Sequence, residues 1–358
     1  MKINIKRKPK QLGVELKRKP QFVIFTDKDG TIDLGDPKFN GILQSINSMG
    51  GMIIPTTGRT VGDIIESLKK KNIKVPDIVV GDNGANIYSY KESKFISKML
   101  LEHDKVMQII NQFIKNGGNS DLIRYTDGST IFASNSNEVR KYYKNSKVAV
   151  FSENINNTIN ETLEITKITL AGTKEEMQEL SEYIKKLGYW TDMGATKFPT
   201  GERGNYRLDI AQNDINKGQA VKKIVSEIAQ PQYGYICVGN GENDIPMFKQ
   251  AIDDGMIAAI MKSAPAEIIE EIREYAKGKQ GKVMIIPENK NLANEFLLKV
   301  SKIFESKMKA EQAAERRGAK RKGRLPHVPR VEQTPLPRRS RTFSAGRGRT
   351  SGKGGRYL

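Results

Sequence analysis

The amino-acid sequence predicts an α/β fold with a parallel sheet that is interrupted by an inserted α+β module. From residue 22 to about residue 85, short apolar runs alternate with segments of helical periodicity, and the alternation returns after about residue 206. This rhythm is typical of β–α–β units, which build parallel sheets. The segment in between contains hairpin signals instead, so we expect a separate module there. A chain of 358 residues has room for about two domains.

The two outer stretches supply the elements of the parallel sheet. Before the insertion we expect strands at residues 22–26, 52–55 and 77–80, and helices at 39–49 and 61–71. Gly50 and Gly51 end the first helix, because glycine is unfavourable inside helices. After the insertion we expect strands at 207–210, 235–238, 256–261 and 283–286, and helices at 217–229, 244–251, 264–276 and 291–306.

The inserted module has mixed signals. We expect hairpins at 86–97 and at 123–133, the second turning at Asp127-Gly128, together with a strand at 167–171 and helices at 103–115 and 174–187. The sequence therefore divides into a basic N-terminal arm (1–20), a core (21–86 and 206–306), an inserted module (87–205) and a tail (307–358).

Net charge is concentrated at the two ends of the chain. The protein carries a net charge of +19, of which residues 1–20 hold eight Lys/Arg and one acid, and residues 306–358 hold sixteen Lys/Arg and three acids. The body is therefore close to neutral. Residues 307–358 are expected to be a basic, disordered tail, although residues 307–317 could extend the last helix. Residues 316–358 could bind a polyanion such as RNA or DNA, with weak nonspecific affinity as the alternative.

The composition also bears on the compartment. Cys237 is the single cysteine, so an intrachain disulfide is excluded. No apolar run follows the lysine-rich start, and no apolar stretch approaches the roughly 18 residues of a membrane helix. We expect a cytoplasmic protein without a signal peptide or a transmembrane segment.

Two carboxylates follow the first predicted strand, in the segment Asp27-Lys28-Asp29-Gly30-Thr31. Open α/β sheets place their ligands beyond the carboxyl ends of such strands. One aspartate can attack phosphorus and form an aspartyl-phosphate, and a second can transfer protons. An ordinary Asp-Gly turn is the alternative for this segment alone.

Three further strand ends carry groups suited to phosphate or metal. Thr57, Gly58 and Arg59 offer a hydroxyl and backbone N–H groups before a helix. Lys217 opens the helix after the strand at 207–210 and could neutralise phosphate and carboxylate charge. The segment 239–244, which follows the strand at 235–238, contains Asn240, Asn243 and Asp244, whose side-chain oxygens suit Mg²⁺. Each of these motifs, taken alone, also has a purely structural explanation, namely a capped turn or a solvated lysine.

The four motifs in this order resemble the haloacid dehalogenase (HAD) superfamily, in its Cof-type, sucrose-phosphate-phosphatase-like branch (subfamily IIB). The resemblance spans about residues 22–304 and implies a Rossmann-like core with an inserted C2-type cap. It implies that Asp27 is the nucleophile and a metal ligand, and that Asp29 is the general acid/base, with its carbonyl on the metal. Substrate phosphate would lie at the position that matches Thr57, Gly58, Arg59, Asn83 and Lys217. The metal site would add Asn240, Asn243 and Asp244.

One residue departs from the family pattern. The family usually has aspartate where this chain has Asn240, so the site has one negative charge fewer and weaker Mg²⁺ binding is expected. The implied activity is a Mg²⁺-dependent phosphatase for a small phosphorylated substrate such as a sugar phosphate. A nucleic-acid-associated phosphatase, an RNA- or DNA-binding protein acting through the tail, and a hexose-phosphate phosphotransferase remain alternatives. In the cap, Arg124, Lys197, Arg203 and Arg207 are candidate contacts for an anionic substrate, although exposed arginines are usually solvated.

Overall fold

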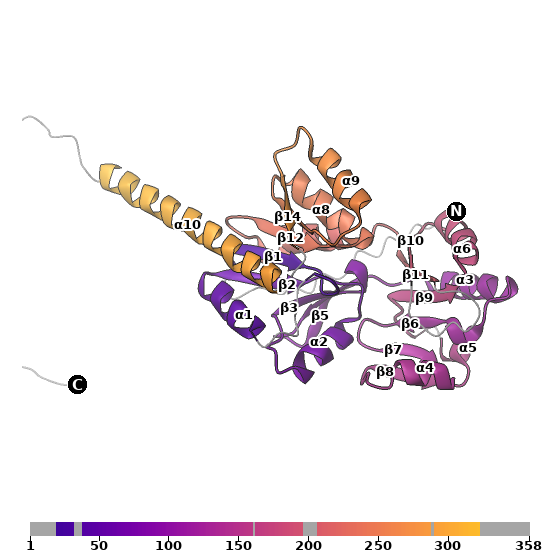
Figure 1. Ribbon diagram of the computed structural model, residues 1–358. Coiled ribbons are helices and arrows are strands. Elements are labelled where there is room, and N and C mark those ends of the chain that lie inside the picture. Colours follow the sequence, from indigo (N-terminus) through magenta and orange to yellow (C-terminus); the bar gives the residue numbers. More distant parts are fainter. Residues whose placement is uncertain (1–18, 32–37, 160–161, 196–205, 288–289, 323–358) are drawn as a thin grey trace, which may run out of the picture. The chain divides into compact units, whose positions relative to one another are not determined.

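A computed structural model describes residues 19–31, 38–159, 162–195, 206–287 and 290–322 (Figure 1). The chain forms two units, Met1–Glu311 and Gln312–Leu358. All the sheets and the site described below lie in the first unit, and the last helix (Lys290–Lys322) begins in it.

The predicted parallel sheet is present. Its strand order is β14-β13-β12-β1-β2 and every neighbouring pair is parallel. The strands are β1 (Phe22–Thr26), β2 (Gly51–Pro55), β12 (Tyr235–Gly239), β13 (Ile257–Met261) and β14 (Lys282–Ile286). Side chains alternate between two buried clusters, one on each face, which explains why the strands appear in the sequence as continuous apolar runs.

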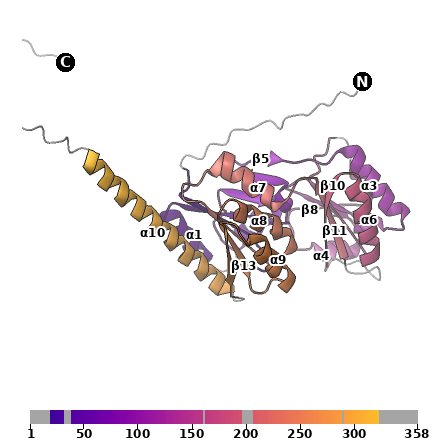
Figure 2. The same cartoon turned by 90° about the horizontal axis from the view of Figure 1, so that it is seen from above.

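Helices cover both faces of this core sheet. Helices α1 (Phe39–Ser48), α2 (Val61–Lys70) and the beginning of α10 (Lys290–Lys322) pack on one face. Figure 2 shows the beginning of α10 beside α1. Phe304 of α10 stacks on Phe22 of β1 with ring centroids 4.9 Å apart, so the closing helix is anchored to β1. The other face is covered by α7 (Lys217–Lys223), which continues as a π-helical segment (Ile224–Ala229), α8 (Ile245–Asp253) and α9 (Ala266–Ala276).

A second sheet of three strands extends the core. It consists of β3 (Ile78–Gly81), β4 (Asn86–Ser89) and β5 (Lys94–Lys98), and an isolated parallel bridge between Thr56 and Val80 joins it to β2. The β4–β5 hairpin was predicted correctly but was assigned to the cap. Ile87 and Ile96 instead pack in a core cluster, because the hairpin pairs with the core strand β3.

The inserted module is an α+β domain, as predicted. Its sheet has the order β10-β11-β9-β6-β7-β8, and α3 and α6 contribute to the same buried cluster. The elements are α3 (His103–Lys115), β6 (Arg124–Thr126), β7 (Ile131–Ser134), α4 (Asn137–Tyr142), β8 (Ala149–Ser152), α5 (Ile155–Thr158), β9 (Lys167–Gly172), α6 (Lys174–Lys186), β10 (Tyr189–Ala195) and β11 (Tyr206–Gln212). Four of these elements were not predicted from the sequence: α4, α5, β8 and β10.

One predicted strand lies in the other sheet. The strand expected at 207–210 was assigned to the parallel core, but β11 is antiparallel to both β9 and β10 in the cap. Its buried residues Leu208 and Ile210 belong to the cap cluster. The core therefore resumes with α7. The alternation of apolar and polar residues in β11 is typical of an antiparallel strand, so the pattern itself favoured the cap sheet.

The ends of the chain lie largely outside the described residues. The predicted arm is described only from Lys19, and the polyanion-binding role predicted for 316–358 falls on a segment that is described only as far as Lys322. The last helix was expected at 291–306 and continues to Lys322, so the disorder predicted from residue 307 is wrong for residues 307–322. Among the described residues, no helix has the length and apolar character needed to cross a membrane. The cytoplasmic location stays a prediction.

Candidate active site

The turn after β1 and the loop after β12 meet at the edge of the core sheet. The backbone N–H of Asp27 donates to the carbonyl of Val238 at 2.8 Å, which continues the pairing of the two strands. The Thr31 hydroxyl donates to Asn240 Oδ1 at 3.1 Å. Gly30 has φ +81°, and a Cβ there would lie 2.4 Å from Asn240 Nδ2. A glycine is therefore needed for the close approach of the turn to the loop.

A fully buried lysine joins the two aspartates of this edge. Lys217 Nζ donates to Asp27 Oδ1 at 2.6 Å and to Asp244 Oδ1 at 2.5 Å. Burial alone would lower the pKa of Lys217, but the two carboxylates raise it above its ordinary value. Burial raises the pKa of Asp27 to about 6, against the opposing charge of Lys217. The lysine is therefore the group that favours the ionised form of Asp27.

Asp244 positions the lysine and the loop around it. Its Oδ2 accepts hydrogen bonds from the backbone N–H groups of Asn240 at 2.8 Å and Gly241 at 2.9 Å. Because its Oδ1 contacts Lys217, both carboxylate oxygens are engaged. The sequence had placed Asp244 among the metal ligands, and these contacts favour a supporting position instead.

Asp29 points toward an arginine from the next motif. Arg59 Nε and Nη2 donate to its two oxygens at 2.7 and 2.8 Å, while Arg59 Nη1 donates to Asp63 at 3.0 Å. Burial would raise the pKa of Asp29, but the hydrogen bonds and charge of Arg59 hold it below its ordinary value. The carboxyl group is thus kept ionised and fixed in orientation.

The predicted phosphate-binding loop is tied to two neighbouring loops. The backbone N–H of Arg59 donates to the buried Thr57 hydroxyl at 3.2 Å, and the N–H of Asn83 donates to the Thr57 carbonyl at 2.9 Å. Asn83 Oδ1 in turn accepts from Asn243 Nδ2 at 3.0 Å. Asn83 has φ +55°, a left-handed conformation that costs a non-glycine residue free energy. Its contacts on both sides offset this cost.

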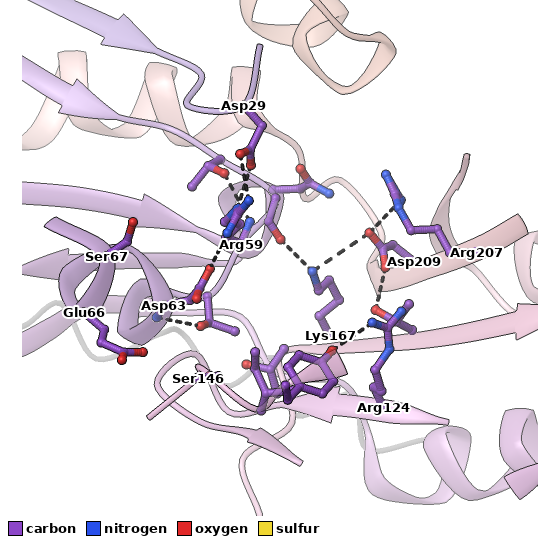
Figure 3. A pocket seen from close by; sticks show the side chains of 18 of the residues that line it. Asp29, Arg59, Asp63, Glu66, Ser67, Arg124, Ser146, Lys167, Arg207 and Asp209 are labelled. Carbon is purple, nitrogen blue, oxygen red and sulfur yellow. Dashed lines mark hydrogen bonds and ion pairs between the residues drawn. The ribbon is translucent and has the colours of Figure 1, made fainter. Parts of the chain in front are cut away.

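These groups form one wall of a cavity of about 1280 Å³ between core and cap (Figure 3). Eight of the predicted site residues line it: Asp27, Asp29, Thr57, Gly58, Arg59, Asn83, Asn240 and Asn243. Lys217 and Asp244 do not line the cavity, but Lys217 contacts Asp27 and Asp244 holds Lys217. The structure therefore brings together residues from four separate parts of the chain.

The opposite wall comes from the cap. Arg124 and Arg207, two of the four candidate cap residues, line the cavity, whereas Lys197 and Arg203 lie outside the described residues. Arg124 donates to the Tyr143 hydroxyl at 2.8 Å. Lys167 also lines the cavity but was missed, because its position at the start of an apolar strand resembles a solvated strand end. A charged residue directly before a buried run was the available signal.

A largely buried carboxylate, that of Asp192, lies beside Arg207 of the cap wall. Arg207 pairs with Asp209 at 3.2 Å and with Asp192 at 3.4 Å. Burial raises the pKa of Asp192 to about 6, with Asp209 and Glu242 adding to the effect and Arg207 and Lys167 opposing it. Glu242 belongs to the core loop before Asn243, so charge on the cap and charge on the core meet here.

Replacement of Asp192 is expected to change how stability depends on pH. The pKa of Asp192 is about 6 when folded and 3.8 ordinarily, so folding is favoured by its protonated form. This stability is present at low pH and is lost as the pH rises through about 6. Asp192→Asn cannot ionise and should gain about 1–3 kcal/mol over wild type between pH 4 and pH 7. Urea unfolding at several pH values measures this. The exposed Asp104→Asn is the control. If the free energy of unfolding depended on pH in the same way in Asp192→Asn and wild type, the expectation would be contradicted.

The oxygens at this edge suit a hard cation. Among the described residues no group of three or more His, Cys, Asp and Glu side chains could hold a metal ion. The cavity floor nevertheless presents one carboxylate, Asp27, with the amides of Asn240 and Asn243. Carboxylate and amide oxygens are the donors that Mg²⁺ accepts, with water completing its shell. These oxygen donors therefore fit Mg²⁺, with one negative charge fewer than a site that has aspartate at the position of Asn240.

Comparison with known proteins decides the family. The family of haloacid dehalogenase-like hydrolases matches residues 24–280. The chain belongs to this family. The haloacid dehalogenase fold and membership predicted from the four motifs are thus confirmed, and the chain is a hydrolase of this type. One similar protein is YxeH of Bacillus subtilis (strain 168), named as a candidate phosphatase, which is 22% identical over 258 residues, covering 69% of this chain and 90% of YxeH.

Several solved structures share the fold of this chain. A haloacid dehalogenase-like hydrolase from Bacteroides thetaiotaomicron has a TM-score of 0.58 at 17% identity, covering 78% of this chain and 98% of its own. TM0651 from Thermotoga maritima has a TM-score of 0.56 at 19% identity, covering 77% and 96%. The sugar phosphatase BT4131, of HAD subclass IIB, has a TM-score of 0.52 at 19% identity, covering 79% and 98%.

Proposed function

We propose that this protein is a phosphatase that hydrolyses a small phosphorylated substrate, with sugar phosphates as the first class to test. One observation carries the proposal: Asp27 lies on the floor of the cavity with one carboxylate oxygen fixed by the buried Lys217. A carboxylate held in this way can attack phosphorus with its other oxygen. The naming of YxeH as a candidate phosphatase and of BT4131 as a sugar phosphatase supports this substrate class.

Asp27 would carry the covalent step. Its free oxygen forms a bond to phosphorus while the bond between phosphorus and the substrate's ester oxygen breaks, which leaves an aspartyl-phosphate. Lys217 stabilises the ionised nucleophile beforehand and the negative charge of the transferring group afterwards. Water then attacks the phosphorus, and inorganic phosphate leaves with Asp27 restored.

Asp29 would move the protons of both steps. The ionised form that Arg59 holds is the form that accepts a proton from the attacking water. Donation of a proton to the leaving oxygen requires a protonated Asp29, and therefore the loss of at least part of its pairing with Arg59. The exposed position of this pair at the cavity allows such an exchange.

Mg²⁺ would be held by the Asp27 carboxylate, the Asp29 backbone carbonyl and the amide oxygens of Asn240 and Asn243. When bound, it would neutralise charge on the phosphoryl oxygens during transfer. The Asn240 oxygen already accepts a hydrogen bond from Thr31, which orients it toward the Asp27 turn.

Asn240→Asp is expected to strengthen Mg²⁺ binding. It restores the negative charge that the family usually has there, and the affinity should rise roughly tenfold because ligand charge tunes cation binding. Isothermal titration with Mg²⁺ measures the change without any substrate. Asn111→Asp adds the same charge on the exposed face of α3 and serves as control. An unchanged affinity would mean that Asn240 does not contribute to the cation site.

A panel of phosphate esters tests the proposed function. We expect Mg²⁺-dependent phosphate release from small sugar phosphates by the full chain, and equal turnover by a version that ends at Lys322. Release only from nucleic-acid ends would contradict the proposal and favour a role for the basic tail. Transfer of phosphate to a second sugar, without free phosphate, would instead indicate a phosphotransferase.

A further inference from the structure

Lys167 is a buried cap lysine that the mechanism above does not use. It is one of two lysines buried in the described part of the chain, the other being Lys217. Lysine is almost never fully buried without partners. Its position at the first residue of β9 places it on the cavity wall that faces the core (Figure 3).

The partners of Lys167 come from both domains. Its Nζ donates to the carbonyl oxygen of Gly58 at 2.6 Å. It also lies 3.6 Å from Asp82 Oδ1, in the core, and 3.9 Å from Asp209 Oδ2, in the cap. The two carboxylates compensate its charge, and the short hydrogen bond directs it to the phosphate-binding loop.

The Gly58 carbonyl belongs to the same planar peptide as the backbone N–H of Arg59. This N–H donates to the Thr57 hydroxyl at 3.2 Å. A trans peptide points its two polar groups in opposite directions, so fixing the carbonyl also fixes the direction of the N–H. Two hydrogen bonds and one peptide therefore link Lys167 to the hydroxyl that is expected to contact the substrate's phosphate.

A second contact ties the cap to the other end of this loop. The backbone N–H of Val61, the first residue of α2, donates to the cap carbonyl of Gly128 at 2.9 Å. A Cβ at Gly62 would lie 2.0 Å from the Ser129 carbonyl oxygen, so the cap turn lies directly against the first turn of α2. Residues 58–61 are therefore held by the cap at both ends.

We propose that Lys167 is a positioning residue that orients the peptide after Gly58 and the Thr57 hydroxyl, so that the phosphate-binding loop is complete only with the cap docked on the core. The inference rests on the proposed phosphatase function, since it assigns phosphate to this loop. It deepens that function by making phosphate affinity depend on a residue of the cap.

Lys167→Met tests the proposal in the full-length protein. Two quantities are measured: the Kd for inorganic phosphate with Mg²⁺ present, and kcat and KM for p-nitrophenyl phosphate. We expect the Kd to rise about tenfold and kcat to fall roughly ten- to a hundredfold, since a misplaced group costs this much. Lys167→Arg keeps a donor for the Gly58 carbonyl and should recover part of both quantities. Lys185→Met makes the same change on the outer face of the cap and should change neither.

A second variant distinguishes a loss of folding from a loss of phosphate binding. Methionine at position 167 leaves the buried carboxylates of Asp82 and Asp209 without the lysine, so the single variant could fail to fold. The double variant Lys167→Met with Asp82→Asn removes one of these buried charges. If the single variant does not fold, the same Kd, kcat and KM measurements on the double variant test the proposal. A folded variant with Kd and kcat within about twofold of wild type overturns the proposal, as does an equal loss in Lys185→Met. A wild type that binds phosphate but hydrolyses no ester contradicts the proposed function alone, and the Kd comparison then decides the role of Lys167. A wild type that binds no phosphate overturns both.

Discussion

Asp27→Asn is expected to reduce phosphate release at least about a thousandfold while leaving the fold intact. The amide cannot act as the nucleophile, but it has nearly the volume of the carboxylate and can still accept a hydrogen bond from Lys217. Because burial raises the pKa of Asp27, removal of this charge should not lower the thermal unfolding temperature by more than a few degrees. Steady-state kinetics on a small phosphate ester and circular dichroism measure the two effects.

The exposed Asp104→Asn provides the matched control for this variant, since its side chain is fully exposed on α3. It should retain wild-type turnover. If Asp27→Asn folded and kept substantial turnover, Asp27 could not be the nucleophile.

Lys217→Met is expected to cost both stability and activity. The variant leaves Asp27 and Asp244 buried and close together without their cation, and breaking such a buried pair costs about 3–5 kcal/mol. Urea unfolding should show this loss, and phosphate release should fall to background because Asp27 is no longer held ionised.

A second variant separates charge from packing at this position. Lys217→Met with Asp244→Asn removes one of the two uncompensated carboxylates, so it should recover part of the lost stability but none of the activity. If Lys217→Met alone were as stable as wild type, the contacts of Lys217 with the two carboxylates would have no energetic importance.

The sequence predicted the core well because its strands are buried on both faces. Such strands appear as short apolar runs separated by helices, and β1, β2, β12, β13 and β14 all do so. The cap is different, since β8 and β10 are partly exposed and have no clear period. Apolar and polar residues alternate clearly in β11. Its pairing with β9 and β10 depends on contacts between distant parts of the chain, which a local pattern does not reveal.

The site was predictable to the extent that it follows from the sheet. The carboxyl ends of adjacent parallel strands lie at the same edge of a sheet. The parallel pairing of β1 with β12 therefore places Asp27 close to Asn240, whatever their side-chain contacts are. The contact of Lys217 with both Asp27 and Asp244 was not predictable, nor was the pairing of Asp29 with Arg59, because both depend on rotamers set by packing. Lys167 could not be placed, since its partner Gly58 lies 109 residues away in the chain.

Chemical trapping of the covalent intermediate tests the central claim most directly. Wild-type protein is mixed with Mg²⁺ and a substrate that it turns over, quenched in acid during turnover and reduced with borohydride, which converts an aspartyl-phosphate to homoserine. Mass spectrometry of the peptide that contains Asp27 and Asp29 then locates the change. The account predicts homoserine at position 27 and none at position 29. Conversion at position 29, or full turnover with no conversion of Asp27 at any quench time, would contradict it.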